Sequence, residues 1–123
     1  MDYIEIGERP WGIYKVIIIE NDYKIKNVTV NPGKRLSLQF HNQRSEHWFI
    51  LKGKAKVTIN KKEFLLKSGD SIDIIKKSVH RIENISNEDL VFIEIQTGSY
   101  LSEDDIVRLE DDFNRVESGD LKK

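Results

Sequence analysis

The fold is decided by residues 32–53, which read PGKRLSLQFHNQRSEHWFILKG. This stretch has the pattern of a strand, a short polar loop and a second strand. Gln39 and His41 are two residues apart, so on a strand their side chains point to the same face. The polar residues 42–45 can turn the chain, and Glu46 then opens the next apolar run, where its side chain can converge on the first two.

A second polar run lies further along the chain, where residues 78–84 read SVHRIEN. His80 in this run can supply a fourth ligand beside Gln39, His41 and Glu46. Two imidazoles, a carboxylate and an amide oxygen suit a divalent Zn, Mn, Fe, Co or Ni ion, and the pattern leaves its identity open. The alternative is a metal-free interior in which these groups are hydrogen-bonded to one another.

Length and composition describe a single domain of 123 residues with 20 basic and 21 acidic side chains, a net charge of −1. This balance favours neither nucleic acid nor an anionic membrane as a partner. The absence of cysteine excludes a disulfide framework, a thiolate ligand and a Cys nucleophile. The N-terminus is acidic, unlike a signal peptide, and the longest apolar run, residues 16–19, is far shorter than the ~20 residues of a membrane span. We therefore expect a cytoplasmic protein.

Runs of β-branched and apolar residues, separated by short turns, predict roughly ten short strands. Residues 53–54 and 60–62 are interpreted as hairpin turns between three consecutive strands. No segment alternates a strand with a long helix. The chain is therefore predicted to be all-β, an antiparallel barrel or jelly roll.

One short C-terminal helix is predicted at about residues 103–113. Ser102 can cap its first turn, and the acidic residues that follow suit exposed helix amides. Ile106, Leu109 and Phe113 would share one apolar face. We expect this helix to cover an end of the barrel or a dimer partner, beside a core of residues 9–100 within a single domain 1–123.

The spacing resembles the two-part signature of cupins, whose fold is a double-stranded β-helix. The matching positions are Gly33, Gln39, His41, Glu46 and Gly53 in the first part and Gly69, His80 and Asn84 in the second. Three positions depart from the signature: Gln39 stands where cupins usually have His, and Ile75 and Lys77 replace Pro and Gly. The first departure concerns a ligand, and the other two concern a turn.

A closer resemblance links residues 9–12, 32–48, 80–84 and 93–111 to the C-terminal domain of type II mannose-6-phosphate isomerases. That module is often fused behind a mannose-1-phosphate guanylyltransferase domain, and Gln is a family trait at its first ligand position. No Gly-rich nucleotide-binding segment precedes Arg9, so we expect the isomerase module without the nucleotidyltransferase half.

The resemblance implies active-site roles for Arg44 and His47. Strand alternation places His47 on the face opposite Glu46, unless a bulge after the loop turns its side chain inward. Arg44, in the predicted loop, can contact a phosphate or an enediolate, although a surface ion pair is the plainer interpretation. The resemblance also favours a pocket position for Gln96.

Further candidates have weaker support from the pattern. Arg81 can bind phosphate or enediolate and Glu83 can act as the base, or the two side chains can simply pair. Lys34 can hold a phosphate at the mouth of the barrel or can be solvated. Asn84 shares the face of His80 and suits a structural role better.

Three functions are compatible with these residues. The first is a metal-dependent isomerase of mannose 6-phosphate and fructose 6-phosphate, working through a cis-enediol as a single domain and as a homodimer. The second is a non-catalytic cupin that binds a sugar phosphate or sugar nucleotide beside a separate guanylyltransferase. The third is another cupin enzyme, a dioxygenase or a sugar epimerase, because one barrel hosts many chemistries.

Overall fold

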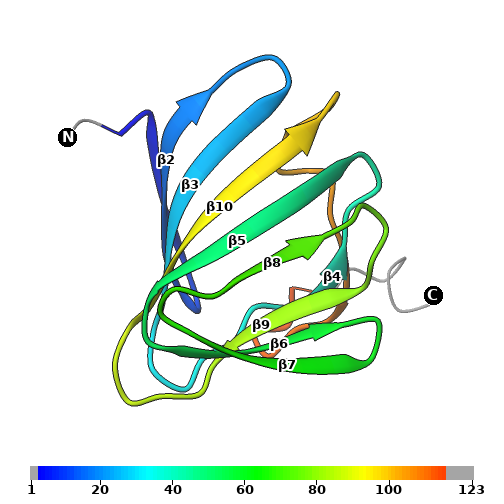
Figure 1. The fold of residues 1–123 in the computed structure, drawn as a ribbon. Coiled ribbons are helices and arrows are strands. Elements are labelled where there is room, and N and C mark those ends of the chain that lie inside the picture. The colour runs from blue at the N-terminus through cyan, green and yellow to red at the C-terminus, as the bar shows by residue number, and fades with distance from the viewer. Residues whose placement is uncertain (1–2, 116–123) are drawn as a thin grey trace.

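The computed structural model describes residues 3–115, and these form two antiparallel sheets that face one another (Figure 1). The described residues contain strands and turns but no helix. The predicted all-β class is therefore confirmed.

The larger sheet has six strands in the order β1-β2-β3-β10-β5-β8, and the smaller has five in the order β11-β4-β9-β6-β7. The bounds of the first sheet are β1 Glu5–Arg9, β2 Gly12–Ile19, β3 Tyr23–Val30, β10 Leu90–Gly98, β5 Arg44–Lys52 and β8 Ser71–Ile74. Those of the second are β11 Val107–Glu110, β4 Leu38–Phe40, β9 His80–Asn84, β6 Lys54–Ile59 and β7 Lys62–Lys67.

The inner face of the larger sheet is apolar at one end and polar at the other. Every second residue of β3, β10 and β5 is buried, as the pleat of a half-covered sheet requires. The apolar half of this face supplies Val28, Val30, Leu90, Phe92, Trp48 and Ile50 to the core. The polar half carries Lys24, Lys26, Glu94, Gln96, Arg44 and Glu46, all of them buried. The strands thus place charged groups together inside one end of the barrel.

The turn predicted at residues 53–54 does not form a hairpin. β5 pairs with β10 and β8, whereas β6 pairs with β7 and β9, so the chain passes from one sheet to the other at Gly53. Gly53 has a φ of 91°, and a Cβ there would lie 2.9 Å from the Asp89 carbonyl oxygen. Local sequence cannot distinguish the two connections, because both need a tight turn. The hairpin predicted at residues 60–62 is confirmed by the pairing of β6 with β7.

The predicted C-terminal helix is wrong, because residues 107–110 form strand β11. β11 pairs with β4, which would otherwise leave backbone hydrogen-bonding groups unpaired along one edge. The carboxylate of Asp105 does not cap a helix but accepts hydrogen bonds from the amides of Asn42 and Gln43, both at 2.9 Å. Tertiary pairing thus overrides a weak local preference for helix.

No helix in residues 3–115 is long and apolar enough to cross a membrane.

Candidate metal centre and pocket

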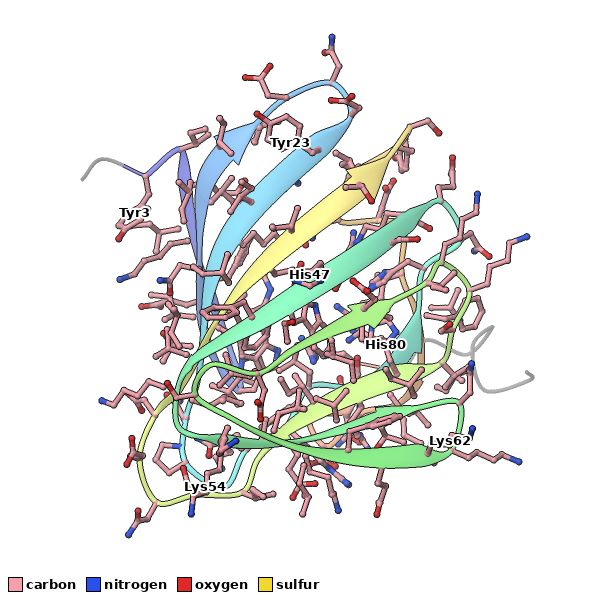
Figure 2. The ribbon with its side chains drawn as sticks, in the orientation of Figure 1. Tyr3, Tyr23, His47, Lys54, Lys62 and His80 are labelled. Carbon is pink, nitrogen blue, oxygen red and sulfur yellow. The ribbon has the colours of Figure 1, made fainter. Side chains whose placement is uncertain are left out.

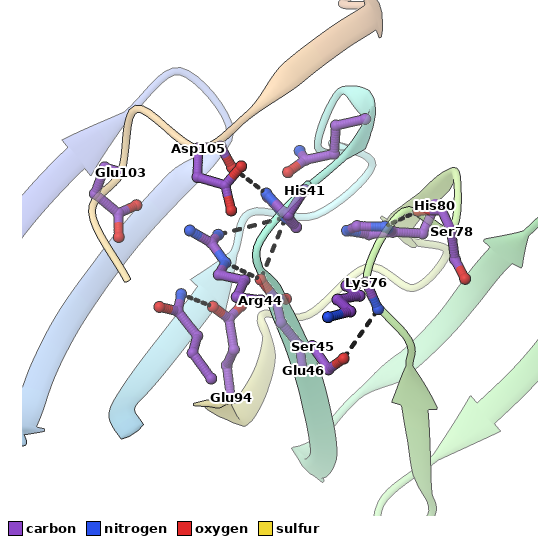
Figure 3. Close-up of polar contacts among 12 residues, drawn as sticks. His41, Arg44, Ser45, Glu46, Lys76, Ser78, His80, Glu94, Glu103 and Asp105 are labelled. Carbon is purple, nitrogen blue, oxygen red and sulfur yellow. Dashed lines mark hydrogen bonds and ion pairs between the residues drawn. The ribbon is translucent and has the colours of Figure 1, made fainter. Parts of the chain in front are cut away.

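His41, Glu46 and His80 meet inside the polar end of the barrel (Figure 3). One ligand atom from each lies within 4.8 Å of the others, and all three residues are buried. His41 directly follows β4, Glu46 lies on β5 and His80 on β9, so both sheets contribute. Figure 2 shows His80 between the sheets. This convergence is the one that the sequence predicts.

Hydrogen bonds fix the orientation of both imidazoles. His41 Nδ1 lies 2.7 Å from the backbone oxygen of Asp105, and His80 Nδ1 lies 2.9 Å from that of Ser78. A carbonyl oxygen only accepts, so each Nδ1 holds the proton and each Nε2 keeps a lone pair. Burial lowers the pKa of His41 to about 4 and also lowers the pKa of His80. Both rings are therefore neutral near pH 7, the form that binds a metal.

Glu46 is held as a carboxylate by its neighbours. Burial alone would raise its pKa, but the charge of Arg44 and the two imidazoles lower the pKa to about 2. Arg44 Nε donates to Glu46 Oε2 at 2.8 Å, and Trp48 Nε1 donates to Oε1 at 2.9 Å.

The space between His41 and Glu46 suits a cation. With the proton of His41 on Nδ1, its Nε2 lone pair faces Glu46 Oε2 across 3.3 Å. Two acceptors at this distance repel one another unless positive charge lies beside them. Arg44 supplies part of this charge, since its Nη2 lies 3.4 Å from His41 Nε2. The donor set therefore fits a divalent ion.

Gln39 lies directly opposite His80 in the pairing of β4 with β9, so both side chains share the inner face. Its amide nitrogen donates to the hydroxyl of Ser37 at 2.8 Å, which leaves the carbonyl oxygen for another partner. This oxygen is the atom that a metal would bind.

A cavity of about 190 Å³ opens beside the metal-ligand set. Its lining has more basic than acidic side chains. The basic ones are Arg9, Lys26, Arg44, Arg81, Arg108 and Arg115, and the acidic ones are Glu46, Glu94 and Glu103. The cavity therefore suits an anionic ligand.

Glu94 is an acid of this cavity whose pKa is raised, opposite to the shift of Glu46. Burial and the nearby Glu46 carboxylate raise its pKa to about 7, although Lys26 and Arg44 oppose the shift. The amide nitrogen of Gln96 donates to Glu94 Oε2 at 2.5 Å. A carboxyl group that exchanges its proton near pH 7 suits acid–base chemistry. In the sequence, Glu94 and Gln96 alternate with apolar residues and so predict a polar row on one face of a strand. Only the fold shows that this row faces the interior.

The predicted substrate residues Arg44 and Arg81 both line the cavity and are buried. Arg44 begins β5 and does not lie in a loop as predicted. Among the described residues, neither Arg44 Nη1 nor Arg81 Nη2 has a hydrogen-bond partner. Arg81 Nε donates to the Leu36 carbonyl oxygen at 3.0 Å, which holds its guanidinium beside the residues that precede β4. Both groups keep a free donor for a ligand.

Three other predicted residues lie away from the cavity. His47 faces the outside of β5, where its Nδ1 lies 2.6 Å from Asp73 Oδ1 (Figure 2). Glu83 is on the outer face of β9, 3.7 Å from Lys56 Nζ, and Lys34 is exposed. No bulge turns His47 inward, because β5 keeps its register with β8 from Glu46 to Phe49. Neither of the predicted bases, His47 and Glu83, therefore lies in the cavity, whereas Glu94 lines it.

Sequence reasoning misses Arg108 because it assigns this residue to a helix. In β11, Arg108 pairs with Gln39, and Gln39 pairs with His80, so the three side chains form one row across the inner face. Glu103 and Lys26, which also line the cavity, have no local signal that distinguishes them from surface charges.

Several known proteins resemble this chain. Alginate biosynthesis protein AlgA of Pseudomonas aeruginosa is 49% identical over 108 residues, which cover 88% of this chain and 22% of that protein. Mannose-1-phosphate guanylyltransferase ManC of Salmonella typhimurium is 46% identical with the same coverage. The chain thus spans about a fifth of the length of these relatives.

Solved structures confirm the predicted cupin fold. The capsular polysaccharide assembling protein CapF from Staphylococcus aureus superposes with a TM-score of 0.77 at 19% identity, over 86% of this chain and 34% of CapF. A mutant of Bacillus subtilis oxalate decarboxylase OxdC superposes with a TM-score of 0.73 at 26% identity, over 85% of this chain and 30% of that protein.

The family model described as "Mannose-6-phosphate isomerase C-terminal" matches residues 4–111, which is nearly all of the described range 3–115. The chain therefore belongs to the family of mannose-6-phosphate isomerase C-terminal domains.

Proposed function

We propose that the chain is a metal-dependent isomerase that interconverts mannose 6-phosphate and fructose 6-phosphate. The proposal rests on one observation: neutral His41 and ionised Glu46 present lone pairs to one another at 3.3 Å, beside a cavity that both Glu46 and Glu94 line. Family membership and the names of the relatives support a phosphosugar as the ligand.

His41, Glu46 and His80 would hold the ion, with the carbonyl oxygen of Gln39 as a fourth ligand. A bound divalent cation would supply a Lewis acid that stabilises negative charge on substrate oxygens. Its identity is left open between Zn, Co, Mn, Ni and Fe, because histidine and carboxylate ligands suit all of them.

Glu94 would be the general base. Isomerisation moves a proton between C1 and C2 of the sugar through a cis-enediol, so one group has to take the proton and return it. A pKa of about 7 gives Glu94 a substantial population of both protonation states at neutral pH. Gln96, whose amide donates to Glu94 Oε2, holds the carboxylate in position.

Basic side chains of the cavity would bind the anionic parts of the substrate. Arg44 lies beside Glu46 and can stabilise the developing enediolate with its free Nη1. Arg81 and Arg108 extend the positive lining over the smaller sheet. Binding energy from the phosphate would then orient the sugar at the reacting carbons.

A second candidate is a cupin that binds a sugar phosphate or sugar nucleotide without turnover and works beside a guanylyltransferase. It is favoured by the name of the relative ManC, which is a mannose-1-phosphate guanylyltransferase, and by the coverage of only 22% of that protein. A homodimer and a cytoplasmic location remain our predictions, and light scattering of the purified protein tests the first.

An isomerase assay separates the two candidates. The protein is stripped with a chelator, reloaded with each divalent ion in turn, and assayed for conversion of mannose 6-phosphate to fructose 6-phosphate. We expect turnover that depends on the ion and disappears in Glu94→Gln, which retains the three metal ligands. Metal-loaded protein that binds mannose 6-phosphate without converting it contradicts the isomerase and supports the binding module.

A further inference from the structure

Two buried lysines on the inner face of β3 form ion pairs with the same carboxylate, and one of them, Lys26, also lies opposite Glu94 on β10. Lys24 and Lys26 are 7% and 5% exposed, and their Nζ atoms lie 3.3 and 2.8 Å from the same atom, Glu103 Oε2. Removing two ammonium groups from water is costly unless their charge is matched. One carboxylate oxygen matches this double charge only in part.

The surroundings add further positive charge. Lys26 Nζ lies 4.4 Å from the centre of the Tyr14 ring, and the guanidinium of Arg9 lies 4.8 Å from the same ring. Arg44 approaches from β5, where burial lowers the pKa of its guanidinium but the charges of Glu46, Glu94 and Glu103 raise it further. Lys26 and Glu103 both line the cavity, so this charge is available to a ligand there.

Glu103 reaches these lysines from outside the barrel. It lies in the segment of residues 99–106 between β10 and β11, and its side chain is 41% exposed (Figure 3). The segment has other anchors: Lys24 Nζ donates to the Leu101 carbonyl oxygen at 2.9 Å, and Asp105 binds the turn at residues 42–43. The carboxylate of Glu103 can therefore leave the lysines while the segment stays attached.

We propose that Lys24 and Lys26 form a phosphate-binding subsite, and that the Glu103 carboxylate occupies it in place of the ligand when the cavity is empty. A phosphate dianion offers three oxygens, so each ammonium gains a separate acceptor. The bound phosphate displaces Glu103 toward solvent. This inference rests on the proposed function for the nature of the ligand, but it concerns binding alone.

The alternative is a purely structural role, in which Glu103 only fastens the segment to the barrel. The two roles predict opposite effects of Glu103→Gln. This variant keeps the size of the side chain and removes the competing charge. If Glu103 competes with the ligand, removing its charge raises phosphate affinity. If Glu103 only attaches the segment, the variant has a lower melting temperature, and its phosphate affinity is unchanged or lower.

Calorimetric titration of the full chain with inorganic phosphate and with mannose 6-phosphate tests the subsite. We expect Glu103→Gln to bind both about three- to tenfold more tightly than the wild type, because the ligand no longer competes with a carboxylate. Lys26→Met is expected to bind both about tenfold or more weakly, because a charge-assisted contact is lost. Unphosphorylated mannose is expected to show neither change.

Two further variants keep the test decisive. Lys26→Met with Glu103→Gln removes both members of the shorter ion pair, while Lys24 keeps its hydrogen bond to the Leu101 carbonyl oxygen, so this variant covers the case in which Lys26→Met alone does not fold. Lys56→Met is the control, because Lys56 lies on β6 with Glu63 and Glu83 and does not line the cavity. Unchanged phosphate affinity in Glu103→Gln, or in the double variant compared with Glu103→Gln, would overturn the inference.

The outcome is separable from that of the proposed function. Tighter phosphate binding in Glu103→Gln without isomerase activity supports the subsite and contradicts the isomerase. Metal-dependent isomerase activity, with the same phosphate affinity in the wild type and the variants, supports the isomerase and contradicts the subsite.

Discussion

His41 and Asp105 are joined by a hydrogen bond from imidazole Nδ1 to the backbone oxygen at 2.7 Å, across 64 residues of sequence. This bond places the proton on Nδ1 and leaves Nε2 toward Glu46. The Asp105 carboxylate meanwhile accepts from two amides of the turn that follows His41. One residue of the C-terminal segment thus orients a candidate metal ligand and holds its loop.

Replacement of Asp105 by Ala is expected to weaken metal binding. The loop after His41 loses two hydrogen bonds, so the imidazole is held less precisely, and metal affinity falls about tenfold or more. The free energy of unfolding falls by about 1–2 kcal/mol, because two partly buried backbone amides lose their acceptor. Competition with a fluorescent zinc chelator measures the first effect, and urea unfolding the second. Asp104→Ala is the control, since Asp104 is exposed and bonds to Tyr100 and Ser102 away from the loop after His41; equal losses in both variants contradict the prediction.

Added divalent ions are expected to raise the melting temperature of the wild type. An ion that binds only the folded chain stabilises it by about 2.7 kcal/mol at a free concentration one hundred times the dissociation constant. His41→Ala and His80→Ala are expected to lose this response, because each removes a buried imidazole ligand. His47→Ala is expected to keep it, because His47 lies outside the barrel with Asp73. Differential scanning fluorimetry with and without a chelator measures the response, and loss in His47→Ala speaks against the assigned ligand set.

Glu94→Gln is expected to abolish proton transfer while the metal remains bound. General bases contribute about a hundred- to ten-thousandfold to rate, so a loss of kcat in this range is expected. In the wild type, kcat/KM should fall as the pH drops below about 7, where the carboxylate becomes protonated. Glu94→Asp should keep part of the activity and the same limb of the pH profile. An unaltered profile in Glu94→Gln would show that another group is the base.

The same residue makes stability depend on pH. The folded pKa of Glu94, about 7, lies above its ordinary value of 4.5, so the folded state binds more protons than the unfolded state between these limits. Stability therefore falls as the pH rises from 4.5 to 7. Glu94→Gln has no carboxyl group to titrate, so its free energy of unfolding should rise relative to that of the wild type by on the order of 2–3 kcal/mol between pH 4.5 and 7. Urea unfolding at several pH values measures the difference, and parallel curves for the two proteins contradict it.

Arg108→Ala is expected to raise KM for mannose 6-phosphate about tenfold, because the inner row beside Gln39 and His80 loses its cation. Arg35→Ala is the matched control. Arg35 forms a partly exposed pair with Asp112, and pairs of this kind contribute less than about 1 kcal/mol. Steady-state kinetics of both variants provide the comparison. Equal KM values for the wild type and Arg108→Ala would remove Arg108 from the substrate site.

The candidate metal ligands and the barrel are predictable from sequence because both depend on local periodicity. Gln39 and His41 share a face through the two-residue repeat of a strand, and short apolar runs between turns allow few architectures. The position of His47 opposite Glu46 follows from the same alternation, which the structure bears out.

The positions of the proposed base Glu94 and of Arg108 depend instead on pairing between distant segments. Glu94 has the sequence pattern of any alternating strand, and its raised pKa comes from burial next to Glu46 on another strand. Residues 103–113 have a helical apolar spacing, yet the open edge of β4 binds residues 107–110 as a strand and brings Arg108 beside Gln39. The sequence alone thus determines the periodicity of each segment. The partner of a strand edge or of a buried charge is decided only by the tertiary structure, because the stabilising free energy comes from contacts between segments that are far apart in sequence.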